Sequence, residues 1–199
     1  MTATNFPDFL TEPVDVVARK LLGCMFVREI DDRVVRVRIV ETEAYDQEDE
    51  ASHAFGGQTT RNATMFRDAG HLYVYFTYGM HHCCNVVTGG AGHGSGVLIR
   101  AVEPLDNREF LEARRGVSGA NVTNGPGKVT QALGIDRALD GHDLHRAPLL
   151  LVQGMLHAGE TVSTSPRIGI SKARERHRRF FVNNNPYVSV SPLNKTTLK

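Results

Sequence analysis

Long apolar runs are absent from this sequence, and cysteine is scarce. No stretch approaches the roughly 18 consecutive apolar residues that a membrane-spanning helix requires. The opening segment MTATNFPDFL also lacks the basic head and apolar run of a secretion signal. We therefore expect a cytoplasmic protein without a membrane partner. The three cysteines are too few and too unevenly spaced for a disulfide framework, so we expect reduced thiols.

Motifs for bound phosphate or metal are missing as well. A phosphate-cradling GxxxxGK(S/T) loop is excluded because Val122 replaces its first glycine and Val129 its final hydroxyl residue. The run HHCC at residues 81–84 contains zinc-ligand types, but neighbouring side chains on a strand point to opposite faces. Each face would then carry two candidate ligands where zinc needs three or four. The zinc-deaminase pattern around PCxxC is also absent, so we expect neither a metal nor another cofactor.

The composition is that of an ordinary globular protein. Hydrophobic residues make up 41% of the 199 residues and charged residues 23%, which excludes disorder, collagen-like repeats and a long coiled coil. A chain of this length buries about 70% of the surface that its unfolded form exposes. We find no internal repeat and no linker, and we predict a single domain over residues 1–199.

Charge is unevenly distributed, although the net charge is only +1. Acidic residues are in excess in the first half of the chain and basic residues in the second. Six carboxylates fall within residues 41–50, and we expect most of them to be solvated. A basic block over residues 167–179 holds six Lys or Arg and a single acid, Glu175. This block is equally consistent with a solvated surface and with contacts to nucleic-acid phosphates.

Hydrophobic periodicity predicts a short helix followed by a hairpin in the first quarter of the chain. After Thr11-Glu12-Pro13, the helical stripe consists of Val14, Val17, Ala18, Leu21 and Leu22, and Gly23 ends the helix. Strands at 24–27 and 33–45, separated by two aspartates, form an antiparallel hairpin. Because side chains alternate along a strand, the face that carries Val35 and Ile39 continues through Glu43 and Tyr45 if no bulge intervenes.

The remaining elements are short. We predict a second hairpin from strands at 72–77 and 81–87 with its turn at Tyr78-Gly79, and a glycine-rich loop at 89–96. Further strands are expected at 97–102, 149–152 and 187–190, and helices at 107–115 and 128–133. These elements predict an α+β domain with a mostly antiparallel sheet core, short flanking helices and a protruding β-hairpin. A parallel doubly wound sheet is not expected.

Candidate chemistry gathers around the end of the first long strand. A carboxylate at the rim of an apolar face, such as Glu43, is a reasonable general base, although a solvated surface glutamate is the alternative. Tyr73 and Tyr75 belong either to a pocket or to an aromatic cluster inside the sheet. Tyr78 stands beside the glycine of a tight turn, where a large ring has little room to be buried. It is therefore either an exposed residue without a role or a wedge between stacked bases.

Several motifs occur together in a recognisable order. They are VETEAY at 40–45, EDEASH at 48–53, GHLYVY at 70–75, YGM at 78–80, VLIRAVEP at 97–104, GPGK at 125–128, RIGI at 167–170 and PYVSV at 186–190. Through these motifs, nearly the whole chain resembles the alkyladenine DNA glycosylase family. The resemblance implies a monofunctional enzyme that flips alkylated or deaminated purines, such as 3-methyladenine and hypoxanthine, out of duplex DNA and hydrolyses their N-glycosidic bond.

The resemblance also assigns roles to individual residues. It implies that Tyr78 fills the gap left by the flipped base and that Asn85 forms the pocket floor and rejects guanine. Tyr45 and His53 would line one side of the base and Tyr75 the other. Cationic purines would gain a cation–π attraction of about 0.5–2 kcal/mol from such rings.

The resemblance implies a water nucleophile rather than a covalent one. Glu43 would deprotonate the attacking water and stabilise the cationic sugar, and Arg100 would hold the water and a nearby phosphate. None of the five lysines falls at a pocket position in this mapping, so a Schiff-base step is not expected.

The implied partner is double-stranded DNA that contains damaged purines, bound by a monomer, associated with the nucleoid if the source is bacterial. Lys128, Arg167, Lys172 and Arg174 would contact its phosphates. His81, His82 and the glycine-rich loop depart from the family pattern, which puts the substrate range in doubt. Two other functions stay open: a non-catalytic binder of damaged or bent DNA, and a hydrolase of free nucleosides.

Overall fold

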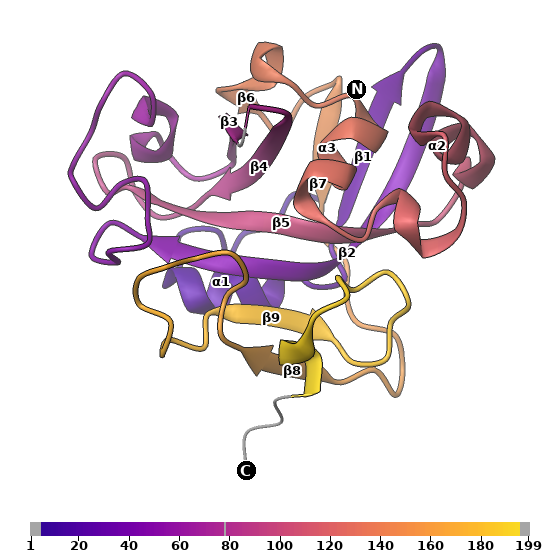
Figure 1. The fold of residues 1–199 in the computed structure, drawn as a ribbon. Helices are drawn as coiled ribbons and strands as arrows, with labels where there is room; N and C mark the ends of the chain where they lie inside the picture. The colour runs from indigo at the N-terminus through magenta and orange to yellow at the C-terminus, as the bar shows by residue number, and fades with distance from the viewer. Residues whose placement is uncertain (1–4, 78, 196–199) are drawn as a thin grey trace.

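The computed structural model describes residues 5–77 and 79–195. Within these residues, nine strands form one antiparallel sheet in the order β6-β3-β4-β5-β2-β1-β7, with β9 paired to β2 and β8 paired to β9. The sheet is strongly curled, and short helices flank it (Figure 1). The prediction of an α+β fold with a mostly antiparallel sheet is confirmed.

The elements have the following bounds. The helices are α1 (Val14–Lys20), α2 (Arg108–Arg115) and α3 (Pro126–Leu133), with 3₁₀ turns at η1 (Ala63–Phe66), η2 (Gly119–Val122), η3 (Arg137–Leu139) and η4 (Pro192–Lys195). The strands are β1 (Met25–Ile30), β2 (Arg33–Asp46), β3 (His71–Thr77), β4 (His81–Val87), β5 (Ser95–Pro104), β6 (His142–Asp143), β7 (Leu149–Val152), β8 (Val162–Ser165) and β9 (Arg179–Val182).

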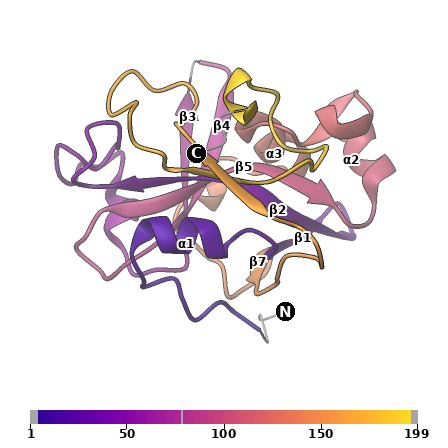
Figure 2. The same ribbon diagram turned by 90° about the horizontal axis from the view of Figure 1, so that it is seen from below.

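Helix α1 forms where the apolar stripe predicts it. All five predicted stripe residues are buried, and the helix lies across the sheet against β2, β5 and β9 (Figure 2). Asp15 in its first turn and Lys20 in its last complement the helix dipole. Gly23 follows with φ of +91°, and a Cβ there would lie 2.4 Å from the Met155 carbonyl carbon. Only glycine therefore permits this close passage of the two chain segments.

Strand β2 is the long central strand that carries the predicted chemistry. It pairs with β1 through a turn in which Asp31 and Asp32 both have positive φ, as the predicted hairpin requires. Its pairing with β5 is irregular around Glu41, but Ile39 opposite Val102 and Glu43 opposite Leu98 share one register. The irregularity is therefore local, and Glu43 keeps its place in the alternation.

The second predicted hairpin is formed by β3 and β4, with Thr77 opposite His81. The hairpin projects beside the segment that joins β8 to β9 (Figure 2). Tyr78, the predicted wedge, lies outside the described residues. The prediction of a strand at 187–190 is wrong, because this segment is a turn followed by irregular backbone. Its Ser189 instead donates hydrogen bonds to the buried Glu41, so polar contacts rather than sheet pairing fix its course.

Candidate active site

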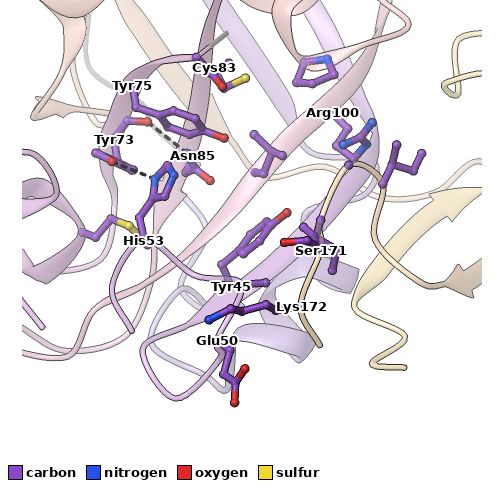
Figure 3. Close-up of a pocket in the computed structure, with 18 residues that line it drawn as sticks. Tyr45, Glu50, His53, Tyr73, Tyr75, Cys83, Asn85, Arg100, Ser171 and Lys172 are labelled. Atoms are coloured by element: carbon purple, nitrogen blue, oxygen red, sulfur yellow. Dashed lines mark hydrogen bonds between the residues drawn. The ribbon is translucent and has the colours of Figure 1, made fainter. Parts of the chain in front are cut away.

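A cavity of about 420 Å³ opens between the β3–β4 hairpin, the ends of β2 and β5, and the segment after β8 (Figure 3). This volume lies within the usual range of small-ligand pockets, about 300–1,000 Å³. Six of the predicted site residues line it: Tyr45, His53, Tyr75, Asn85, Arg100 and Lys172. The structure thus brings together residues that are far apart in the sequence.

Glu43 lies directly behind the cavity wall and is fully buried. Its Oε1 accepts a hydrogen bond from the Ile168 backbone N–H at 2.7 Å, and its Oε2 accepts one from the Tyr45 hydroxyl at 2.9 Å. Arg100 Nη1 lies 3.2 Å from Oε2. Tyr45, Ile168 and Arg100 all line the cavity, so Glu43 lies one layer of residues behind the cavity surface. The alternative of a solvated surface glutamate is excluded.

The acidic block that contains Glu43 is less solvated than predicted. Glu41, Glu43 and Asp49 are fully buried, whereas Glu48 and Glu50 are exposed. The expectation that most of these carboxylates are solvated is wrong for the buried three. Each of them lies within 4 Å of at least one arginine guanidinium, which compensates for the loss of hydration.

An aromatic wall forms the side of the cavity opposite Tyr45 (Figure 3). The His53 ring meets Tyr75 edge-on at 4.5 Å, and its Nδ1 lies 3.2 Å from the Tyr73 hydroxyl. The structure therefore groups His53 with Tyr75, whereas the sequence analysis placed it beside Tyr45. Burial and the nearby Arg61 lower the pKa of His53, and burial raises the pKa of Tyr73 to about 12. These rings are thus uncharged near neutral pH.

Both interpretations of the tyrosine pair hold in part. Tyr73 is fully buried in a small apolar cluster, yet it also borders the cavity, and its ring stacks on Tyr75 at 5.5 Å. The sequence analysis left open whether Tyr73 belongs to the pocket, and the resemblance gave it no role, although its spacing of two from Tyr75 predicts the same face of the strand. Asn85 on β4 lies beneath both, with Nδ2 3.5 Å from the Tyr73 carbonyl oxygen.

The prediction that Arg167 contacts DNA phosphates is wrong. Its side chain has no accessible surface and pairs with Asp49 at 2.7 Å. Its Nη1 also donates to the Ala44 carbonyl oxygen at 2.9 Å, and its guanidinium lies 4.6 Å from the centre of the Tyr45 ring. Burial alone would raise the pKa of Asp49, but Arg167 and Arg178 hold it below its usual value. Arg167 therefore supports Tyr45 from behind.

The other predicted phosphate ligands are distributed around the cavity. Lys172 is exposed at its lining and Arg174 is exposed nearby. The expectation that no lysine reaches the pocket is corrected by Lys172. Lys128 lies in a neighbouring hollow with His81, where its Nζ donates to the side chains of Asn121 and Asn124.

Two findings concern metal and membrane. Among the described residues, no group of three or more His, Cys, Asp or Glu side chains could hold a metal ion. Cys83 lines the cavity while Cys84 packs in the hydrophobic core, as alternation along a strand predicts. Within residues 5–77 and 79–195, the structure contains no helix with the length and hydrophobicity of a membrane span.

The chain is similar to known proteins over most of its length. Residues 8–186 match the model of the methylpurine-DNA glycosylase (MPG) family. A protein of Carboxydothermus hydrogenoformans named "Putative 3-methyladenine DNA glycosylase" is 46% identical over 183 residues, which are 91% of this chain and 96% of that protein. A protein of the same name from Prosthecochloris aestuarii is 44% identical over 196 residues, covering 96% of this chain and 94% of the relative.

Proposed function

Because the chain belongs to the methylpurine-DNA glycosylase family, whose members act in DNA repair, we propose that it removes damaged purines from double-stranded DNA by hydrolysing their N-glycosidic bond. The observation that carries this proposal is the position of Glu43. It is a fully buried carboxylate hydrogen-bonded to Tyr45 and Ile168, two residues that line an aromatic cavity.

The proposed reaction begins with base flipping. Inside a duplex, stacking and the helix itself screen the anomeric carbon, so the nucleotide must swing out before water can reach it. The cavity offers Tyr45 on one side and the His53–Tyr75 pair on the other. Alkylated purines such as 3-methyladenine gain a cation–π attraction of about 0.5–2 kcal/mol from such rings. Hypoxanthine, which is neutral, would be held by stacking, and it must also take up a proton as the glycosidic bond breaks.

Glu43 then acts as the general base. Each of its oxygens accepts one hydrogen bond from the protein, and a carboxylate oxygen has a further lone pair for a water molecule. Because Glu43 is buried behind the cavity wall, this water would have to enter between Tyr45, Ile168 and Arg100. The negative charge orients and deprotonates this water, and it stabilises the oxocarbenium-like sugar that forms as the base leaves. Arg100 borders the same space and would hold the water or a phosphate.

We propose water rather than Lys172 as the nucleophile. A Schiff-base lysine is activated by desolvation or by a neighbouring cation, and Lys172 is exposed at the cavity lining. Substrate choice would depend on Asn85 at the cavity floor, whose amide would crowd the exocyclic amino group of guanine.

The function is tested by measuring base release from one lesion in three contexts: duplex, single strand and free nucleoside. We expect release from DNA but no turnover of the nucleoside, and a panel of lesion-bearing duplexes then gives the substrate range. Tyr78→Ser should slow release from the duplex more than from the single strand, because only the duplex needs a wedge to hold the base out. Equal effects on both substrates would contradict the wedge, and nucleoside turnover would favour a nucleoside hydrolase.

DNA affinity is expected to depend on the exposed basic residues near the cavity. The double substitution Lys172→Ala, Arg174→Ala should weaken duplex binding and reduce the slope of log K against log salt by about 2, since each lost phosphate contact removes about one unit. Fluorescence anisotropy over a salt series measures both quantities. Arg146→Ala is the control, because Arg146 is exposed on the β6–β7 connection, outside the cavity. An unchanged slope in the double variant would remove both residues from the DNA interface.

A further inference from the structure

Arg100 lies between two buried carboxylates rather than facing one. Its Nη1 lies 3.2 Å from Glu43 Oε2, on the cavity side, and its Nε donates to Glu41 Oε1 at 2.9 Å. Both glutamates are fully buried. Burial alone would lower the pKa of Arg100, but Glu43 and Glu41 raise it above its usual value. The guanidinium is therefore charged and shared between the two carboxylates.

Glu41 is also bound on the side away from the cavity, by Arg179 and Ser189. Arg179 Nε donates to Glu41 Oε1 at 2.7 Å, and Ser189 donates to Oε2 through its backbone N–H at 2.7 Å and its hydroxyl at 2.6 Å. Burial alone would raise the pKa of Glu41, but Arg100, Arg179 and Ser189 hold it below its usual value. Glu41 is thus a charged residue that does not line the cavity.

Arg179 completes the arrangement and is fully buried. It donates to the Ser165 hydroxyl at 3.0 Å and to the Asn194 side-chain oxygen at 2.8 Å, and it lies over the Phe181 ring at 4.4 Å. The result is a buried row of alternating charges, Arg179–Glu41–Arg100–Glu43, that runs from β9 through β2 to the cavity wall. We call it the charge row.

We propose that Glu41 and Arg179 are positioning residues that set how strongly Glu43 acts as the base. The proposal rests on the proposed function. Arg100 Nε donates its hydrogen bond to Glu41, so the guanidinium neutralises the charge of Glu43 only in part. The remaining negative charge on Glu43 can act on the water and stabilise the developing sugar cation. Charge interactions in a low-dielectric interior are strong enough for such sharing to affect reactivity.

Apart from Arg100, the titratable side chains that interact with Glu43 in the described part of the chain are neutral. Tyr45 from β2 contacts it directly, and Tyr75 and Cys83 from the hairpin feel its charge. Burial raises the pKa of all three above their usual values. From the described segment after β8, Glu43 accepts a hydrogen bond from the Ile168 N–H, and the charged Arg167 beside it in sequence is paired with Asp49. The charge row therefore supplies the fixed charges to which Glu43 responds.

Two substitutions that remove charges of opposite sign test this proposal. In Glu41→Gln, Arg100 has Glu43 as its only partner in the charge row. The closer pairing stabilises the Glu43 carboxylate but neutralises more of its negative charge. We expect the single-turnover rate of hypoxanthine release to fall by up to about 100-fold, with the acidic limb of the pH–rate profile shifted to lower pH. Arg179→Gln lets Glu41 draw Arg100 away from Glu43, and we expect the acidic limb of the pH–rate profile to shift to higher pH. If Glu41 and Arg179 had a purely structural role, the two substitutions would not shift the acidic limb in opposite directions.

Milder variants keep the test valid if either substitution prevents folding. Ser189→Ala removes one neutral donor from Glu41, which strengthens its hold on Arg100, and should shift the limb in the same direction as Arg179→Gln by a smaller amount. Arg179→Lys preserves the charge and should leave the limb in place. Glu103→Gln is the matched control, since Glu103 also pairs with a buried arginine, Arg38, on β2 but does not line the cavity.

The outcomes separate this proposal from the proposed function. If the unaltered protein releases no base, the proposed function fails. A second outcome is an active protein that loses activity in Glu43→Gln, while Glu41→Gln and Arg179→Gln leave the acidic limb unmoved or shift it in the same direction. In that case the proposed function stands, and the positioning role of Glu41 and Arg179 is contradicted. Circular dichroism and lesion-duplex affinity, both expected to be unchanged, establish that each variant is folded and binds.

Discussion

Glu43→Gln is expected to abolish release of hypoxanthine from a duplex oligonucleotide while lesion binding persists. The amide can still accept the hydrogen bond from Ile168 and keeps the volume of the side chain, but it can neither take a proton from water nor stabilise a cationic sugar. Loss of a general base costs about 10²- to 10⁴-fold in rate. Single-turnover base release with enzyme in excess measures the loss, and gel shift measures binding.

A matched control is available on the same acidic block. Glu48 is exposed, and Glu48→Gln should leave the rate of base release unchanged. Full activity in Glu43→Gln would refute the assignment of the base. It would then favour a different water-activating group, whereas binding without release in the unaltered protein would favour a non-catalytic binder of damaged DNA.

Asp49→Asn is expected to cause the largest loss of stability. It leaves the Arg167 guanidinium buried without a counter-charge, since Arg167 pairs with Asp49 at 2.7 Å and neither side chain is accessible. Breaking such a pair costs about 3–5 kcal/mol, which lowers the melting temperature by about 6–20 °C for a protein of this size. Thermal unfolding followed by circular dichroism measures the change.

The same pair predicts a pH dependence. The pKa of Asp49 is held below its usual value in the folded state, so its contribution is complete above the unfolded-state pKa and is lost as pH falls through the folded-state value. The difference in unfolding free energy between the unaltered protein and Asp49→Asn should therefore shrink below about pH 4. Asp31→Asn is the control, because Asp31 pairs with Arg114 on the surface, where a pair is worth about 1 kcal/mol or less. A melting temperature equal to that of the control would contradict a structural role for the Asp49–Arg167 pair.

The site was predicted from the sequence mainly through the resemblance to a family. The period of two along the strand predicted that Glu43 and Tyr45 share one face near the strand end. It did not predict whether either residue is buried. The quoted motifs contain His53, Tyr75 and, in VLIRAVEP, Arg100. Asn85 lies outside these motifs and was assigned by its position in the resemblance, and the cavity brings all four residues together. Arg167 lies in the quoted motif RIGI, but its burial against Asp49 was not predicted, because a basic block has the same composition whether its members face solvent or a buried carboxylate.

The sequence by itself determined the local elements: helix α1, both hairpins and the end of α3 at Gly134. The predicted end of α1 at Gly23 was late, because the helix ends at Lys20 and Leu21 caps it. These elements depend on the alternation of side chains along a strand, on the apolar stripe of a helix and on the backbone freedom of single turn or cap residues. Each of these features is contained in a short segment of sequence. Only the tertiary structure decided which charges are buried. Glu41 meets Arg179 and Asp49 meets Arg167 across more than a hundred residues of chain, and a charge's cost or benefit depends on the partner that folding places beside it.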